Sequence, residues 1–262
     1  LIRNAKDGVV HALNGSGRAP AAASPDDLLS QGFQQIPDSG VYSVSVPGTV
    51  HGWETILNAH GTMTLADVLA PAIKYAEEGF PVTDIISYQW ASQAQKLAQY
   101  PSGQEMLKNG RAPRPGEIMK LPTLARTLRL VAEGGAEAFY TGEVAAKIAS
   151  FIQENGGWLS VDDLESHTSD WDEPIKTDYR GVTCWECPPN GQGVVALEAL
   201  NIVEGFDIAS MGPQSSDAYH HLIEATRLAF SDAYQYVADP RKASVPTSDL
   251  ISKNYADGRR SL

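Results

Sequence analysis

The sequence predicts a mainly helical α/β protein. Apolar residues spaced three and four apart, the pattern of amphipathic helices, cover much of the chain. Strand patterns are confined to stretches near residues 10, 45 and 180, which is too few and too scattered for a complete doubly wound sheet. Either the sheet is small, or other polypeptide completes it. With 262 residues, 42% of them hydrophobic, the chain is long enough for one large compact domain or a tight pair of lobes.

The first third of the chain mixes short strands with capped helices. Asn14-Gly15-Ser16-Gly17 is a turn signal that ends the first strand. Ser24 and Thr64 are N-cap residues at two helix starts, and Gly79 ends the second of these helices. The predicted strands cover residues 9–13 and 41–46, and the predicted helices cover residues 25–32, 50–60 and 65–78.

The rest of the chain is predicted to be helical except for one strand region. Residues 84–100 form an amphipathic helix, and residues 101–115, rich in Gly, Pro and basic side chains, form a surface loop. A strand-like region, residues 175–187, is followed by a glycine-containing break and then by helix from about Val194. Further helices are expected over residues 121–134, 136–140, 142–155, 160–164, 217–238 and 249–260.

The charge of the chain excludes some partners. Asp and Glu number 32 against 20 Lys and Arg, for a net charge of -12, and no basic cluster with interleaved aromatics occurs. We therefore expect no nucleic-acid partner. No apolar run approaches the roughly 20 residues of a membrane-spanning helix, so no membrane partner is expected. Residues 1–7 lack the regions of a secretory signal, which leaves the compartment open.

Several patterns that could carry chemistry are better explained structurally. Cys184 and Cys187 form a CxxC pair, but on a strand residues three apart point to opposite faces, which disfavours joint ligation. The six histidines contain no HExxH pattern, and no GxSxG nucleophile motif is present. Acidic pairs such as Asp162-Asp163 suit helix starts or solvated faces rather than a glycosidase pair. We predict no catalytic nucleophile, no metal and no cofactor in this chain.

Arg18 is the one candidate binding residue that the local sequence suggests. The segment Gly15-Ser16-Gly17-Arg18-Ala19-Pro20 lacks the spacing of a nucleotide-binding loop, but it places an arginine between a flexible stretch and a rigid proline. A guanidinium can bind a carboxylate through two parallel hydrogen bonds. The alternative is a solvated surface arginine.

Four groups of segments resemble the γ-glutamyltranspeptidase family, which includes cephalosporin acylases. They keep the family's order and run nearly end to end, so together they are more specific than any single motif. The first is Val46-Pro47-Gly48-Thr49-Val50-His51-Gly52-Trp53. The others comprise residues 139–145 with 155–157 and 162–164, then 179–181 with 188–193 and 200–206, and finally 222–225 with 229–232, 239–240 and 250–255.

The resemblance implies a fold and a partner chain. Members are precursors that cleave themselves, and the new N-terminal threonine of the small subunit is the nucleophile. The implied fold is the four-layer αββα sandwich of N-terminal-nucleophile hydrolases, completed by the small subunit. Residues 1–262 would then be a portion of the large subunit, lacking the family's extreme N-terminal segment and the nucleophile, and inactive alone.

The resemblance also gives Arg18 a role. The family's large subunit grips the α-carboxylate of the glutamyl group with an arginine in an approximate Asp-Phe-Arg-Glu-x-Ala-Pro pattern. Aligned on Ala-Pro, that position falls on Ser16 here, and Arg18 lies two residues later. Either Arg18 reaches the same carboxylate by another loop path, or the pocket admits another acyl group.

Three functions follow from the resemblance. The first is a γ-glutamyltransferase or hydrolase that acts on glutathione-like γ-glutamyl amides. The second is a glutaryl-type cephalosporin acylase on the same fold. The third is a catalytically inactive binding or scaffold homologue.

Overall fold

The computed structural model describes residues 1–262, which divide into two compact units. One unit combines Leu1–Asn14 with Asp170–Leu262, and the other is the continuous segment Gly15–Ser169. Each unit has hydrophobic clusters of its own. No helix in the chain has both the length and the apolar character that crossing a membrane requires.

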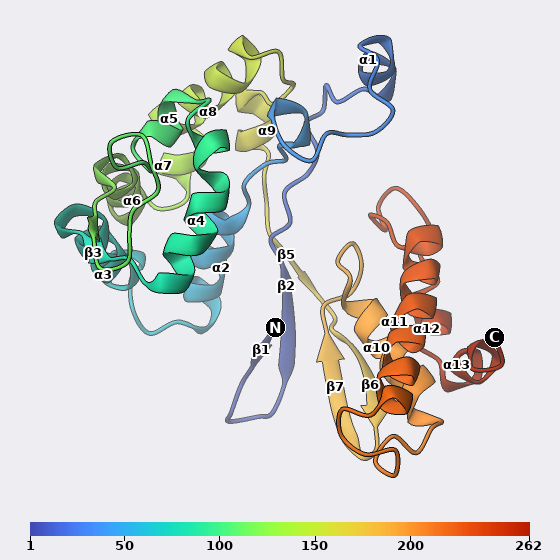
Figure 1. The fold of residues 1–262 in the computed structure, drawn as a ribbon. Coiled ribbons are helices and arrows are strands. Elements are labelled where there is room, and N and C mark those ends of the chain that lie inside the picture. The colour runs from blue at the N-terminus through green and yellow to red at the C-terminus, as the bar shows by residue number, and fades with distance from the viewer. The chain divides into compact units, whose positions relative to one another are not determined.

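The Gly15–Ser169 unit is almost entirely helical (Figure 1). Its helices are α1 (Pro25–Ser30), a 3₁₀ helix (Val41–Ser43), α2 (Thr49–His60), α3 (Leu65–Glu78), α4 (Asp84–Leu97), α5 (Pro101–Gln104), α6 (Pro122–Gly134), α7 (Glu137–Tyr140), α8 (Glu143–Glu154) and α9 (Val161–Glu165). Its strands are β3 (Phe80–Pro81) and β4 (Ile118–Met119), which pair antiparallel.

The helix boundaries follow from the capping residues that the sequence offers. The Ser24 hydroxyl accepts a hydrogen bond from the backbone N–H of Asp27, and Pro25 occupies the first turn of α1. Thr64 forms a capping box with Asp67 at the start of α3. Gly79 ends α3 with φ +99°, a conformation that favours glycine. These predicted boundaries are confirmed.

The core of this unit forms where α3, α6, α7, α8 and α9 meet. Leu159 and Leu164 are both 0% exposed, and Tyr140 joins them at 4%. The other buried members of the cluster are Val46, Val50, Leu69, Val131, Ala136, Ala145, Ala149 and Ile152. Val46 and Val50 anchor the start of α2 in this core.

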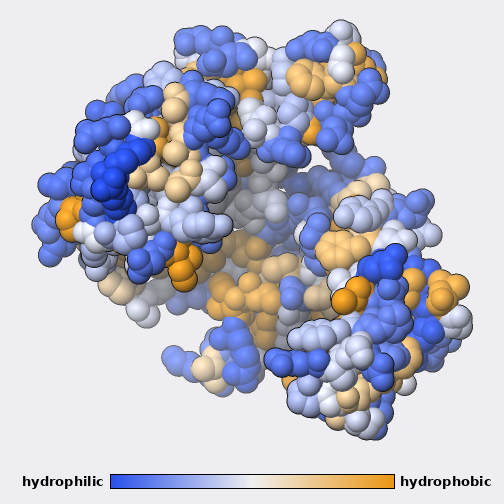
Figure 2. Space-filling view, viewed as in Figure 1, coloured by the Kyte–Doolittle hydropathy of each residue, from blue (hydrophilic) through white to orange (hydrophobic).

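Helix α4 lies outside that core. No residue of α4 is buried, and Ile85 and Tyr88 are 71% and 81% exposed. The view in Figure 2 shows mainly hydrophilic residues over the helices of this unit, with apolar side chains interspersed. The predicted helix is confirmed, but the apolar residues expected on its inner face are largely exposed.

The unit of Leu1–Asn14 and Asp170–Leu262 holds most of the strands. β1 (Ile2–Arg3), β2 (Val10–Asn14) and β5 (Asp170–Asp172) form an antiparallel sheet in the order β1-β2-β5, with Leu13 opposite Trp171. β6 (Ile175–Tyr179) and β7 (Val182–Glu186) form a hairpin in which Thr177 faces Cys184. The helices are α10 (Gly193–Glu204), α11 (Ser216–Tyr236), α12 (Thr247–Leu250) and α13 (Lys253–Arg259), shown beside the hairpin in Figure 1.

A buried amide ties the helices of this unit to the hairpin. Asn201 of α10 is 0% exposed. Its Oδ1 accepts hydrogen bonds from Thr177 Oγ1 at 2.6 Å and Lys253 Nζ at 2.7 Å, and its Nδ2 donates to the carbonyl of Ile251 at 2.7 Å. Because a buried amide is costly unless it is satisfied, these bonds fix α10 against β6 and the C-terminal helices.

Three predictions of local structure were wrong. Residues 41–46 form no strand, because a 3₁₀ turn occupies 41–43 and Val46 then donates a single backbone hydrogen bond to Arg18 instead of joining a ladder. The predicted 101–115 loop begins with α5. The predicted helix over 249–260 is divided between α12 and α13, and Ser252 caps the second. The strands β1, β3, β4 and β5 were not predicted.

Candidate functional site

The loop that carries Arg18 packs its backbone directly against the segment that leads into α2. A β-carbon placed on Gly17 would lie 1.5 Å from the carbonyl oxygen of Val46. One placed on Gly48 would lie 2.0 Å from the carbonyl oxygen of Gly15. Only glycine permits backbones to approach this closely. Gly17 and Gly48 therefore serve close packing, and in Gly17 this role replaces the flexibility that the sequence suggested.

Hydrogen bonds hold the loop at Arg18 and at Ala21. The carbonyl of Arg18 accepts from the backbone N–H of Val46 at 3.0 Å. Three residues further on, the N–H of Ala21 donates to Asp163 Oδ1 at 2.8 Å, while Pro20 between them is buried. The other oxygen of Asp163 caps α9 through Ser160. The main chain of the loop is thus fixed at these two residues.

The side chain of Arg18 is exposed, in contrast to its anchored backbone. One guanidinium nitrogen donates to the carbonyl of Ser166 across 3.5 Å, which is long for such a bond. A carboxylate offers a guanidinium shorter, charge-assisted hydrogen bonds. An anionic ligand would therefore bind the guanidinium more strongly than this carbonyl does.

The cysteine pair does not form a site of its own. Cys184 lies in β7, Cys187 follows the strand, and both are half-buried free thiols. No three His, Cys, Asp or Glu side chains come together in a way that could hold a metal ion. His221 packs instead on Phe206, with ring centroids 4.3 Å apart.

One buried acidic pair joins α10 and α11. Glu198 of α10 is 1% exposed and Asp232 of α11 is 6% exposed. Burial raises the pKa of Glu198 to about 9, the hydrogen bond and charge of Asp232 add to this, and Arg259 opposes it. Asp232 in turn accepts from Tyr255 at 3.1 Å and pairs with Arg259 at 3.0 Å. Although perturbed pKa values mark many active sites, this closed cluster joins α10, α11 and α13 and has a structural role.

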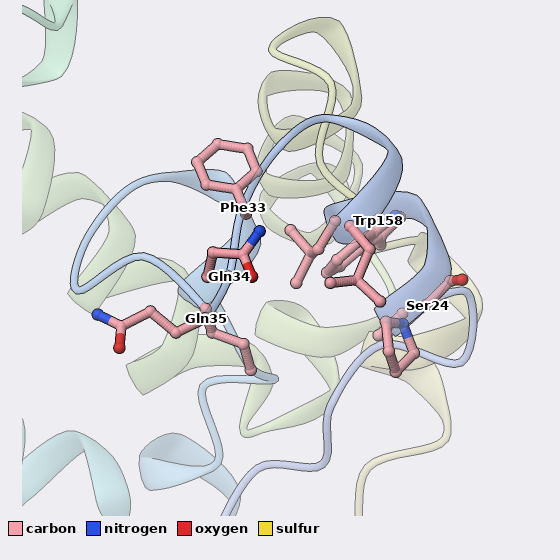
Figure 3. A pocket seen from close by; sticks show the side chains of 10 residues that line it. Ser24, Phe33, Gln34, Gln35 and Trp158 are labelled. Carbon is pink, nitrogen blue, oxygen red and sulfur yellow. The ribbon is translucent and has the colours of Figure 1, made fainter.

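An apolar hollow of about 400 Å³ lies beside α1. Figure 3 shows Trp158 among the apolar side chains that line it, with the Gln35 amide pointing away. Arg18 is not among the lining residues. The hollow offers apolar contact without a charged group, so it does not resemble a site for a carboxylate-bearing substrate.

Comparison with known proteins identifies the family. The sequence matches gamma-glutamyltranspeptidase along residues 1–262. It is 38% identical to the glutathione hydrolase-like YwrD proenzyme of Bacillus subtilis (strain 168), over 94% of this chain and 47% of that protein. The chain therefore belongs to the γ-glutamyltranspeptidase family, and it spans about half the length of the curated relatives it matches.

Solved structures of the family share the fold. The structure of Helicobacter pylori gamma-glutamyltranspeptidase is similar with a TM-score of 0.92 at 30% identity, over 99% of this chain and 76% of that one. A cephalosporin acylase from Bacillus halodurans gives 0.90 at 42% identity, over 97% and 49%. Both sides of the family, glutathione hydrolases and acylases, are thus represented among the relatives.

Proposed function

We propose that this chain is the large-subunit part of an N-terminal-nucleophile enzyme that hydrolyses or transfers γ-glutamyl groups from glutathione-like amides. Arg18 would bind the carboxylate of the acyl group. The observation that carries the proposal is a contrast within Arg18. Its main chain is held by a hydrogen bond from Val46, and nearby Ala21 is held by Asp163, whereas its guanidinium is exposed. An arginine whose main chain is already ordered loses less conformational entropy on binding an anionic substrate than one on a mobile loop.

The proposed contact defines the acyl group by its chemistry. A γ-glutamyl group has five carbons and ends in a carboxylate that is flanked by an ammonium group. A glutaryl group has the same five carbons and the same terminal carboxylate but lacks the ammonium. Arg18 would contact the terminal carboxylate of either donor, and recognition of the ammonium group would depend on other residues.

The proposed reaction places the nucleophile on the small subunit. The threonine hydroxyl attacks the amide carbonyl while its own α-amine takes the proton, and the C–N bond then breaks as that proton passes to the leaving amine. Water or an amino-acid amine next displaces the threonine oxygen from the acyl-enzyme. Backbone N–H groups would stabilise each oxyanion, typically by roughly 3 kcal/mol per donor. On this proposal, residues 1–262 have no activity alone.

The small sheets support the proposal that a second subunit completes the fold. The three-stranded sheet has β1 and β5 at its edges, and β6 and β7 form a sheet of only two strands. Open strand edges present unpaired backbone groups that favour pairing with another strand. Additional strands from a small subunit would give the four-layer αββα sandwich, through an interface of the large apolar kind.

A glutaryl-type cephalosporin acylase is the second candidate. Two observations favour it, the position of Arg18 two residues beyond the family's usual arginine and the 42% identity to a cephalosporin acylase. The carboxylate contact would be retained, and the donor's ammonium group would no longer be required.

The two functions are separated by kcat/KM of the complete, processed precursor for γ-glutamyl and glutaryl anilides. A γ-glutamyl preference of tenfold or more is expected from the first proposal, and the reverse preference would establish the acylase. Replacement of the N-terminal threonine of the small subunit by alanine is the control and should abolish both activities. If the precursor is not cleaved and neither donor reacts, the chain belongs to an inactive homologue and the proposal is wrong.

A further inference from the structure

Tyr140 lies directly behind the turn on which the Arg18 loop rests. Its side chain belongs to the core of the Gly15–Ser169 unit and is 4% exposed. Its hydroxyl donates to the carbonyl of Pro47 at 2.6 Å and accepts from the backbone N–H of His51 at 3.2 Å. Burial raises the pKa of Tyr140, so the hydroxyl keeps the proton that it donates. One hydroxyl thus bridges Pro47, which lies just before α2, and His51 in the first turn of α2.

His51 holds the same turn from its other side. Its Nδ1 accepts from the backbone N–H of Ser169 at 3.1 Å and lies 2.9 Å from the hydroxyl of that residue. A backbone N–H can only donate, so Nδ1 is the acceptor in its hydrogen bond with Ser169. The ring of His167 stacks on Tyr140 with centroids 5.4 Å apart and meets His51 edge-on at 5.6 Å.

The clamped turn is the surface that the Arg18 loop packs on. Val46 comes immediately before Pro47, and its N–H bonds to Arg18. Gly48 comes immediately after Pro47, and a β-carbon there would lie 2.0 Å from Gly15 and 2.7 Å from the ring of His167. Pro47 is therefore held by Tyr140 between the two residues that touch the loop. Movement of this carbonyl would be transmitted to the backbone of Arg18 because no gap separates them.

We propose that Tyr140 and His51 are positioning residues that set where the guanidinium of Arg18 meets the substrate carboxylate. This inference rests on the proposed function of Arg18. Neither residue touches the substrate, and both act through the Val46–Gly48 backbone. The Tyr140 hydroxyl is the more direct test, because it can be removed alone.

The experiment measures kcat and KM of the complete, processed precursor for the donor it prefers and for a butyryl anilide, which has no carboxylate. Tyr140→Phe should raise KM for the carboxylate donor roughly threefold to tenfold, the effect of one lost hydrogen bond. It should change kcat by less than about twofold and leave butyryl turnover as it was. The matched control is Tyr42→Phe, which removes a hydroxyl bonded to Gln31 and should leave all values unchanged.

A double substitution separates this inference from the proposal about Arg18. If Tyr140 acts through Arg18, Tyr140→Phe should have no further effect on KM in an Arg18→Ala background. An equal rise in both backgrounds would overturn the inference, as would an unchanged KM in the single variant. A normal KM in Arg18→Ala alone would instead refute the proposed role of Arg18. Should Tyr140→Phe fail to fold, Ser169→Ala, which removes one polar contact of His51, takes its place with the same outcomes.

Discussion

Gly17 and Val46 pack backbone against backbone, so closely that a β-carbon on Gly17 would fall 1.5 Å from the Val46 carbonyl oxygen. Their neighbours carry the proposed function. Arg18 follows Gly17, and its carbonyl accepts the N–H of Val46. The hydrogen bond of Arg18 and the backbone packing of Gly17 therefore join the loop to the segment that leads into α2.

Gly17→Ala should destabilise the Gly15–Ser169 unit, since the new methyl group would overlap backbone atoms that cannot move away alone. We expect a loss of roughly 1–3 kcal/mol in the free energy of unfolding, measured by denaturant unfolding of the processed enzyme. The control is Gly258→Ala in α13, where a β-carbon would meet open space. There alanine should stabilise by about 0.5–1 kcal/mol. Equal stability of the two variants would contradict the close packing.

Glu198 should make stability depend on pH. Its pKa rises from 4.5 in the unfolded chain to about 9 in the fold, so between these values the folded state binds one more proton. The free energy of unfolding should therefore fall as pH rises through this window, by up to about 1.4 kcal/mol per pH unit from this group. Glu198→Gln should remove that slope. Its free energy of unfolding should therefore rise relative to that of the unchanged protein between pH 5 and pH 8.5.

The measurement is the unfolding midpoint of both proteins at pH 5, 6.5 and 8. Glu133→Gln, at an exposed glutamate of α6, is the matched control and should keep the slope of the unchanged protein. Parallel curves for Glu198→Gln and the unchanged protein would show that Glu198 is not protonated in the fold.

Leu164→Ala should be among the costly core substitutions. Leu164 is 0% exposed in the cluster beneath α9. Truncation would leave a cavity there and cost about 2–5 kcal/mol. Leu124→Ala, at a site that is 45% exposed, should cost much less. Thermal and denaturant unfolding measure both variants. Similar losses in the free energy of unfolding at the two sites would show that Leu164 is not part of the core.

The isolated chain should behave differently from the assembled enzyme. If a small subunit covers the open edges of β5 and the β6–β7 hairpin, residues 1–262 made alone should aggregate or remain partly unfolded. Production with the remaining half of the precursor should restore a single cooperative transition. Calorimetry and size-exclusion chromatography report both properties. A cooperative melt of the isolated chain would count against the predicted interface.

Local signals in the sequence accounted for most helices. Ser24, Thr64 and Ser160 each begin a helix through a side-chain hydrogen bond to the third residue beyond, a pattern contained in four adjacent residues. The strand prediction for residues 41–46 was wrong because alternating large and small residues indicate only that alternate side chains are buried. Val46 is buried although it belongs to no β-ladder. β5 was missed because Asp170-Trp171-Asp172 resembles an acidic loop and becomes a strand only by pairing with β2.

The candidate site could be predicted only in part, because some of its contacts join residues that are far apart in the sequence. Arg18 could be identified from its neighbours and from family resemblance. The contacts of His51 with Tyr140 and Ser169 could not be predicted, because these residues lie 89 and 118 positions from His51 in the sequence. Glu198 gave no signal either, since its environment is created when α10, α11 and α13 meet.

The proposed function depends most on Arg18, and it is tested by the kinetics of Arg18→Ala in the complete, processed precursor. Loss of charge-assisted hydrogen bonds should raise KM for γ-glutamyl-p-nitroanilide or its glutaryl counterpart on the order of tenfold to a hundredfold. Turnover of the butyryl anilide should be unchanged. Arg126→Ala, at an exposed arginine of α6, should alter neither donor. An unchanged KM for both carboxylate donors in Arg18→Ala would show that Arg18 does not bind the substrate carboxylate.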